Sequence, residues 1–351
     1  MKRLVCIVLW LVGALAARGE GLRADTTVIA AHLRAITKTD GFRNYKNTAR
    51  LDATAGYIHY VFGRYADTVF YQPYQVGGRT YRNVVCRFGT KIGTAAGADK
   101  AAWPAKPVVV VGAHYDVCGD QQGADDNASG VVGLLEIARM LHGAALTRPV
   151  ELVAYTLEEP PFFRTPYMGS NVHAQSLKAA GTPVYGMVAV EMIGYFSDLP
   201  RSQDYPIGPM KVLYGRTGDY ILLVKRSGFG PFVQAFSARF SGAQIAENPQ
   251  GGAHCAGGHP HVEVNSLKAP AKISGVDFSD HLNYWNAGYD AMMVTNTAFF
   301  RNKNYHQTTD TMETLDLPRM AVVIDALRAA IVNIDSNPQT QSAPKYSKSI
   351  K

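Results

Sequence analysis

The chain has few cysteines, and their spacing excludes a structural zinc site built from cysteine pairs. Four cysteines occur in 351 residues, and no two of them stand in the Cys-x-x-Cys spacing that such sites use. Cys6 lies in an apolar leader that we expect to be removed. Cys86, Cys118 and Cys255 then remain, in an oxidising compartment if the chain is exported, and three cysteines cannot all pair with one another.

Long apolar runs are absent after the first sixteen residues. Lys2 and Arg3 supply a positive start, and residues 4–16 form an apolar run that is too short to span a bilayer. Ala14 and Ala16 give the small-residue pattern that precedes signal-peptidase cleavage. We therefore predict a signal peptide over residues 1–16 and export to the periplasm or the medium. No integral membrane segment is expected after the signal peptide is removed.

Dense runs of one charge are also missing. The formal net charge is +7, but lysine and arginine are scattered along the chain, which argues against a nucleic-acid partner or a membrane-binding patch. The sequence contains no evident internal repeat. It fits a single domain over residues 17–336, followed by a polar tail over residues 337–351. The oligomeric state stays open.

Strands and helices are predicted to alternate through the centre of the chain. Residues 108–111 are four consecutive valines, a pattern typical of a strand that is covered on both faces. Further strands are predicted over residues 68–74, 82–88, 150–157, 184–190 and 291–297, and helices over residues 28–36, 52–65, 131–141, 170–180 and 318–334. This order predicts an α/β fold with a mixed, largely parallel central β-sheet flanked by helices on both faces. Residues 203–277 are harder to assign, and their Gly- and His-rich part is expected to be a loop.

Each of the central strands runs into a histidine or a carboxylate. In chain order these residues are His114 with Asp116, then Glu158 with Glu159, then Glu191, and finally, after a short loop, Tyr305 with His306. Asp126 joins them just before a predicted helix. Since ligands of open parallel sheets bind beyond the carboxyl ends of the strands, we expect these side chains to converge on one edge of the sheet.

These residue types suit a metal centre. Histidine nitrogen and carboxylate oxygen are the ligands that zinc takes where sulfur is absent. Five such residues exceed the three that normally hold one catalytic zinc, whereas they suit two ions that share a carboxylate. An additional acid that is not a ligand can then take a proton from the attacking water.

Six short motifs resemble those of the di-zinc aminopeptidase family. They are AHYD (residues 113–116), GADDNASG (123–130), EE (158–159), EMIGY (191–195), SDH (279–281) and YHQTTDT (305–311). The family includes secreted bacterial leucyl aminopeptidases, glutamate carboxypeptidases and the related glutaminyl cyclases. The motifs stand in the family's order from about residue 29 to residue 334. The resemblance implies a three-layer sandwich of the zinc-exopeptidase type with two Zn²⁺ ions per chain.

The resemblance also implies a role for each residue. His114 and Glu191 would hold one zinc, Glu159 and His306 the other, and Asp126 would bridge the two ions. Glu158 would be the general base that deprotonates a bridging water, and Tyr305 a donor to the oxyanion. Asp116 would orient the His114 ring, Asp280 would support the site, and Asp125 would be a neighbour rather than a ligand.

Two features depart from the family pattern. Many relatives have Asp where this chain has Glu191, so the ligand reaches one methylene further. After the glutamate pair comes Pro-Pro-Phe-Phe in place of a short Gly-containing turn, which makes Phe162 and Phe163 candidates for the substrate pocket. Cys118 must lie near the metals, and we interpret it as structural, with a bridge to Cys255 as one alternative.

The leading hypothesis is therefore removal of N-terminal, apolar amino acids from peptides. Carboxypeptidase action is the nearest rival, and Arg164, Arg201 and Arg216 are the cations it would draw on for a free carboxylate. Glutaminyl cyclisation on the same scaffold uses one zinc, whereas five ligand positions suit two. A non-catalytic relative would lack a ligand or the base, and this chain has all of them.

Overall fold

The computed structural model describes residues 22–90, 104, 106–247 and 260–336, without the side chains of residues 244–247. The predicted signal peptide, Cys6, Cys255 and the polar tail after residue 336 lie outside the described residues. Within the described part, no helix is both long and apolar enough to cross a membrane.

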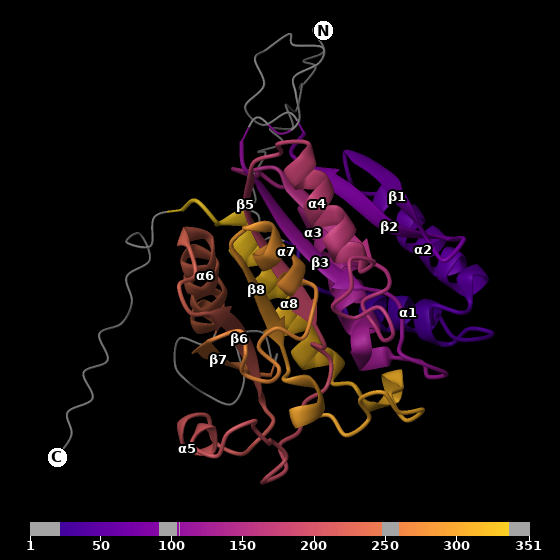
Figure 1. Ribbon diagram of the computed structural model, residues 1–351. Coiled ribbons are helices and arrows are strands. Elements are labelled where there is room, and N and C mark those ends of the chain that lie inside the picture. Colours follow the sequence, from indigo (N-terminus) through magenta and orange to yellow (C-terminus); the bar gives the residue numbers. More distant parts are fainter. Residues whose placement is uncertain (1–21, 91–103, 105, 248–259, 337–351) are drawn as a thin grey trace, which may run out of the picture.

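The sheet has eight strands in the order β1-β2-β4-β3-β5-β8-β6-β7 (Figure 1). The strands are β1 (Thr68–Val76), β2 (Arg79–Phe88), β3 (Val108–His114), β4 (Val150–Tyr155), β5 (Val184–Glu191), β6 (Tyr220–Arg226), β7 (Glu263–Ala269) and β8 (Ala291–Thr295). The four central strands β4, β3, β5 and β8 pair in parallel, as do β6 and β7. The pairs β1–β2, β2–β4 and β6–β8 are antiparallel. The mixed, largely parallel sheet predicted from the sequence is confirmed.

Helices cover both faces of the sheet, which gives three layers. The helices are α1 (Thr26–Thr37), α2 (Thr48–Gly63), α3 (Gly130–Leu141), α4 (Gly169–Ala179), α5 (Met210–Leu213), α6 (Pro231–Glu247), α7 (His281–Ala287) and α8 (Leu317–Val332). One core joins α1, α2, α3, α6 and α8 to one face of the sheet. A second core joins α4 and α7 to the other face (Figure 1).

The strand β3 shows why this architecture follows from the sequence. Its four valines are all buried, and they alternate between the two cores. Successive side chains of a strand point to opposite faces, so an unbroken apolar run requires cover on both sides. Helix α3 belongs to the core on one face of the sheet and helix α4 to the core on the other.

Residues 203–277, which the sequence left without assignment, contain α5, β6, α6 and β7. Strand β6 is apolar and buried through its first five residues and extends the sheet beyond β8. In strand β7 exposed residues alternate with partly buried ones, because this strand lies at the edge of the sheet. Elsewhere the predicted bounds differ by a few residues, as at α2, which begins at Thr48 because Asn47 caps it by accepting from the Arg50 amide.

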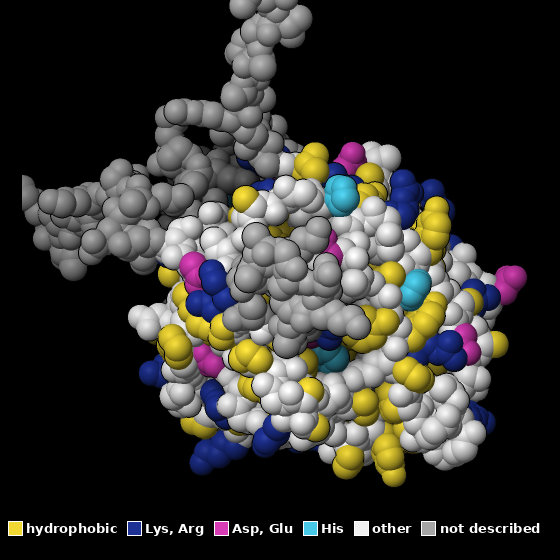
Figure 2. All heavy atoms as spheres, turned by 90° about the horizontal axis from the view of Figure 1, so that it is seen from above, with side chains coloured by type: hydrophobic (Ala, Val, Ile, Leu, Met, Phe, Trp, Pro, Cys, Tyr) yellow, Lys and Arg dark blue, Asp and Glu magenta, His cyan; other side chains and the backbone are white. Residues whose placement is uncertain are grey.

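The surface seen in Figure 2 shows lysine and arginine side chains distributed among acidic and apolar ones rather than gathered in one patch. This distribution follows the scatter of basic residues along the sequence.

Candidate metal centre

The five candidate ligands meet at one edge of the sheet. His114 is the last residue of β3, Glu191 is the last residue of β5, and Glu159 follows β4. His306 lies in the loop after β8, and Asp126 lies in the π-helical turn η1 (Ala124–Ser129) that leads into α3. Because β4, β3, β5 and β8 are parallel neighbours, their carboxyl ends bring residues from more than half of the sequence together.

Asp126 faces both histidines, one with each carboxylate oxygen. Its Oδ1 lies 3.3 Å from His114 Nε2, and its Oδ2 lies 3.1 Å from His306 Nε2. Glu191 Oε2 is 3.5 Å from His114 Nε2, while Glu159 Oε2 is 3.0 Å from His306 Nε2. The five side chains therefore form two groups that share Asp126.

Several of these atoms are buried without a hydrogen bond. Among the described residues, Asp126 Oδ2, Glu159 Oε1 and His306 Nε2 have no hydrogen-bond partner, although His306 Nε2 forms ion pairs with Asp126 Oδ2 and Glu159 Oε2. Leaving such groups unsatisfied costs about 1–3 kcal/mol each, and more for charged groups. Nitrogen and carboxylate oxygen are donors that zinc accepts. The residues present therefore fit a metal centre.

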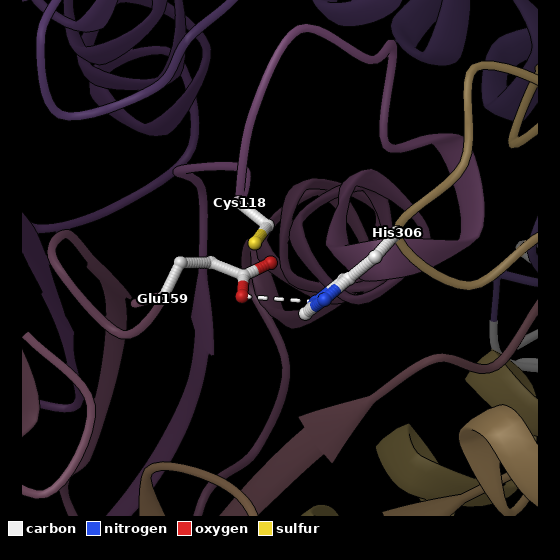
Figure 3. A group of neighbouring side chains, drawn as sticks. All are labelled: Cys118, Glu159 and His306. Atoms are coloured by element: carbon white, nitrogen blue, oxygen red, sulfur yellow. Dashed lines mark ion pairs between the residues drawn. The ribbon is translucent and has the colours of Figure 1, made fainter. Parts of the chain in front are cut away.

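Two clusters in the described residues are spaced to hold a cation. His114, Asp126 and Glu191 form one, and Cys118, Glu159 and His306 form the other, with all ligand atoms within 4.8 Å of one another in each cluster. Figure 3 shows the second cluster, in which the Cys118 sulfur lies beside the Glu159 carboxylate and that carboxylate pairs with His306.

The electrostatics of the site favour bound positive charge. Burial raises the pKa of Glu159 to about 8, and the neighbouring Asp126 carboxylate adds to the rise. Burial likewise raises the pKa of Glu191. Burial alone would lower the pKa of His306, but Asp126 and Glu159 raise it to about 10. Several carboxylates crowded into a buried space are stable only beside cationic groups or metal ions.

Glu158 borders both groups without belonging to either cluster. Its Oε2 lies 3.8 Å from His114 Nε2, and its side chain is 9% exposed, toward the cavity. Burial raises its pKa well above the ordinary value, and Glu159 and Glu191 reinforce the rise against the opposing effect of His114. An acid in this position can exchange a proton with a molecule in the cavity.

Asp116 contacts both His114 and the glutamate pair. Its backbone carbonyl, not its carboxylate, is the nearer partner of His114 Nδ1, at 3.3 Å against 3.7 Å. The carboxylate instead accepts from the backbone amides of Glu158 at 3.2 Å and Glu159 at 3.1 Å. Asp116 thus positions the glutamate pair as well as the histidine, since the β3 loop lies beside the β4 loop.

Backbone strain is concentrated at these positions. Leu157, Met192 and His306 have φ values of 61°, 49° and 57°, in the left-handed region that non-glycine residues rarely occupy. Leu157 precedes Glu158, and Met192 follows Glu191. Such strain persists only where the surrounding structure enforces it, and it is typical of functional sites.

Asp125 is held away from the two groups by hydrogen bonds of its own. Its carboxylate accepts from the amides of Gly194 and Tyr195 and from the side chains of Asn296 and Asn302, at 2.8–3.1 Å. With four donors it has no capacity left for a cation.

Asp310 and Arg43 support the site, and sequence reasoning missed both. The Asp310 carboxylate accepts from the amides of Asp125 at 2.9 Å and Asp126 at 3.1 Å. Arg43 is buried and donates to the carbonyls of Tyr115, Gln122 and Gly123. Asp310 lies within the YHQTTDT motif, so its motif could have identified it as a residue of the site. No local pattern in the sequence pointed to Arg43.

The SDH motif contacts the site through its serine. Ser279 Oγ donates to Glu191 Oε2 at 2.7 Å, and Asn127 Nδ2 approaches the same oxygen at 3.3 Å. Asp280 is fully buried, and burial raises its pKa to about 7. His281 contacts the Val276 carbonyl at 2.8 Å, away from the ligands. Ser279 and Asn127 therefore fix the longer Glu191 side chain.

A cavity of about 150 Å³ opens beside the two groups. Glu158, Glu159, Glu191 and the two histidines form its polar side. Its apolar side consists of Pro160, Phe163, Phe278, Ala298, Phe299 and Tyr305. Phe278 and Phe299 come from parts of the chain in which no local pattern pointed to a pocket.

The predicted pair of pocket phenylalanines separates. Phe163 lines the cavity and packs against Phe278, with ring centroids 5.9 Å apart. Phe162 does not line it and packs against Tyr45, Tyr81 and Tyr167 at the edge of the core. The assignment of Phe162 to the pocket is corrected, because the turn after Glu159 directs these adjacent side chains to different neighbours.

Tyr305 also lines the cavity. Its ring stacks on His306 with centroids 3.8 Å apart and an interplanar angle of 17°. Burial, with added repulsion from the nearby carboxylates, raises its pKa and keeps the hydroxyl protonated. The side chain is therefore placed to fix the imidazole plane and to offer a donor to the cavity.

Comparison with known proteins adds sequence and structural relatives. Residues 92–211 match the model of peptidase family M28. The chain is 39% identical over 309 residues to the uncharacterized Escherichia coli (strain K12) protein YfbL, a match that covers 86% of each chain. The Legionella pneumophila LapA aminopeptidase has a similar structure, with a TM-score of 0.63 and 20% identity over 90% of this chain and 73% of that chain.

A Bacteroides thetaiotaomicron glutaminyl cyclase is equally similar in structure, with a TM-score of 0.63 and 15% identity over 89% of this chain and 99% of that chain. At these identities the two solved structures show a shared fold and do not separate the two activities.

Proposed function

The chain belongs to peptidase family M28, and on that premise we propose that it is a zinc-dependent aminopeptidase that releases apolar residues from the N-termini of peptides. The observation that carries the proposal is Asp126, whose two oxygens face the histidines of two separate ligand groups. One carboxylate shared in this way is the arrangement that two-metal hydrolytic sites use.

In this proposal the chain holds two Zn²⁺ ions. His114 and Glu191 would hold one, Glu159 and His306 the other, with Asp126 shared between them. When bound, the ions supply Lewis acidity toward the peptide carbonyl and make a nearby water more acidic. Ser279 and Asp116 keep Glu191 and Glu159 in place through the hydrogen bonds described above.

Glu158 would carry the proton in the reaction. Its carboxylate lies at the boundary between the cavity and the His114 group, where it would take a proton from the attacking water and return it to the leaving amine. Burial keeps its proton affinity high enough for this transfer. The protonated hydroxyl of Tyr305 would donate to the oxygen on which negative charge develops.

The cavity supports recognition of an apolar residue with a free amine. Its carboxylates can pair with an ammonium group, and its phenylalanines provide an apolar wall. A second cavity of about 50 Å³ shares Glu191, Phe278, Ala298 and Phe299 with the first and continues between apolar side chains that include Leu222 and Met293. An apolar side chain placed along this wall would leave water.

Carboxypeptidase action is less well supported. Among the described residues, neither lysine nor arginine lines the cavity beside the ligand groups. Arg164, one of the cations considered for this role, pairs with Asp277 at 2.5 Å and stacks over Phe163 and Phe278. A substrate carboxylate in this cavity would therefore find a positive partner only in a bound metal ion or a protonated histidine, not in a lysine or arginine side chain.

Matched substrates separate these activities. We expect release from a leucine chromogenic amide and from a leucyl dipeptide, no release from the N-acetylated amide, and no cyclisation of an N-terminal glutaminyl peptide. Equal cleavage of the acetylated amide, or release only from the carboxyl end, would refute aminopeptidase action. Formation of a pyroglutamyl product with a single bound zinc would establish the cyclase instead.

The proposal places the enzyme outside the cytoplasm, on the basis of the signal-like residues 1–16 alone. Expression of the full chain followed by N-terminal sequencing of the exported product tests this location. We expect a mature chain that begins near Ala17, and retention of Met1 in a cytoplasmic product would refute it.

A further inference from the structure

One thiol lies within the reach of the metal centre and is not among the five ligands. Cys118 Sγ lies within 4.8 Å of the ligand atoms of Glu159 and His306, a spacing at which the three can share one cation. In Figure 3 the sulfur lies beside one oxygen of the Glu159 carboxylate, and the dashed line joins the other oxygen to His306. The other described cysteine, Cys86, is buried in β2 and has no such neighbours.

A second observation points to a ligand at the same place. Glu159 is 4% exposed, and its Oε1 has no hydrogen-bond partner, although its Oε2 pairs with His306. His306 Nε2 has no hydrogen bond either, although it forms ion pairs with Glu159 Oε2 and Asp126 Oδ2. The thiol, Glu159 and His306 thus lie close enough to share one position, and Glu159 keeps one oxygen without a hydrogen bond.

The loop that carries Cys118 is anchored. Arg43 donates to the carbonyl of Tyr115 at 2.6 Å on one side of the cysteine and to the carbonyls of Gln122 and Gly123 on the other. Asn44 donates to the carbonyl of Gly119 at 3.2 Å. The sulfur is therefore held in position by backbone contacts on both sides.

We propose that Cys118 supplies a thiolate ligand to the cation held by Glu159 and His306. This inference rests on the proposed metal-dependent function and adds a sulfur donor to a site otherwise built from nitrogen and oxygen. The thiol would release its proton to solvent when the cation binds, as metal-bound cysteines do. Before that, burial and the Glu159 charge raise the pKa of the thiol to about 11.

A thiolate would change the metal preference of this position. Sulfur favours zinc over manganese and magnesium, which prefer oxygen ligands.

X-ray absorption at the zinc edge of the zinc-loaded full chain tests the ligand directly. We expect about one sulfur for every two zinc ions, at about 2.3 Å, beside nitrogen and oxygen at about 2.0–2.2 Å. The cobalt-loaded protein should show a thiolate-to-cobalt charge-transfer band in the near ultraviolet. Scattering from nitrogen and oxygen alone would overturn the proposal.

Cys118→Ala should remove the sulfur signal and the cobalt band, and lower zinc affinity at one of two positions by at least about tenfold, with little change for Mn²⁺. Cys86→Ala is the matched control and should keep both signals. If Cys118→Ala fails to fold, persistence of the sulfur signal in Cys86→Ala and in Cys255→Ala supports the assignment, and its loss in either overturns it.

Assaying the same samples for leucine release separates this inference from the function on which it rests. Sulfur ligation without release would refute the aminopeptidase and leave the ligand in place. Leucine release by a protein whose zinc shows only nitrogen and oxygen ligands would refute the thiolate ligand and leave the aminopeptidase in place.

Discussion

Replacing Glu158 by glutamine should separate catalysis from metal binding. Glu158 lies beside His114 but belongs to neither cation cluster, whereas the adjacent Glu159 belongs to the cluster with His306. Glutamine is nearly isosteric with glutamate but cannot accept a proton at neutral pH. The Asp116 contact to the backbone amide of residue 158 does not depend on the side chain and should survive the substitution.

The magnitude follows from the role of the side chain. A positioned general base contributes about 10²–10⁴-fold to the rate, which corresponds to roughly 3–5 kcal/mol in the activation free energy. We therefore expect Glu158→Gln to lower kcat for a leucine 4-nitroanilide by that factor with little change in KM. The unfolding midpoint and the zinc content should stay close to those of the unaltered chain.

Glu159→Gln is the matched control. It replaces a side chain that pairs with His306 at 3.0 Å, so one of the two metals should bind more weakly, as measured by zinc titration into the stripped protein. Activity should recover in part at high zinc concentration, which Glu158→Gln should not show. Equal loss of metal from both variants, with recovery of both by added zinc, would show that Glu158 is a ligand and that the role assigned to it is wrong.

Four further substitutions test the surroundings of the site and the stability of the fold. Asp310→Asn should lower the free energy of unfolding by about 1–3 kcal/mol and weaken zinc binding by about 10–100-fold, because the Asp310 carboxylate holds the backbone amides of Asp125 and Asp126. Calorimetry measures the first effect and zinc titration the second, and an unchanged zinc affinity would contradict the prediction. Phe163→Ala should raise KM for leucine substrates by about tenfold or more, because Phe163 lines the cavity. Phe162→Ala should leave KM unchanged and destabilise the fold by about 3 kcal/mol, because Phe162 packs against the core. An increase in KM for both variants would show that Phe162 also contributes to the pocket. Burial alone would raise the pKa of Glu151, but contacts with His173 and Arg87 hold that pKa below its ordinary value. The ionised carboxylate therefore stabilises the fold above the unfolded-state pKa of about 4.3, and this contribution is lost as the pH falls through the lower folded-state pKa. Glu151→Gln should show a smaller fall in Tm between neutral and acid pH than the unaltered chain, and an equal fall would refute this reasoning.

Chain order alone indicated both the layers and the edge of the sheet where the site lies. The valines of β3 required cover on two faces, and alternating elements required parallel strands. Parallel strands end at one edge, so His114, Glu191 and Glu159 had to meet there. These inferences depend on local periodicity and on a general property of parallel sheets, neither of which needs knowledge of distant contacts.

Other features depended on contacts between segments far apart in the chain. Arg43 holds the loop that carries Cys118, and Asp310 holds the amides of Asp125 and Asp126 across 185 and 184 residues. Strand β7 could not be read locally, because an edge strand with alternating exposure resembles a loop in composition. Phe278 and Phe299 became pocket residues only through the packing of their loops.

The separation of neighbouring side chains also required the tertiary structure. Asp125 and Asp126 are both acidic and both buried, yet four donors saturate the first, while the second keeps an oxygen free for a cation. Phe162 and Phe163 likewise differ only in which neighbours they meet. The sequence by itself determined which residue types reach the sheet edge, because strand periodicity is local. Tertiary packing decided which of them keeps an unpaired atom facing the site, because hydrogen-bond partners come from segments that only folding brings close.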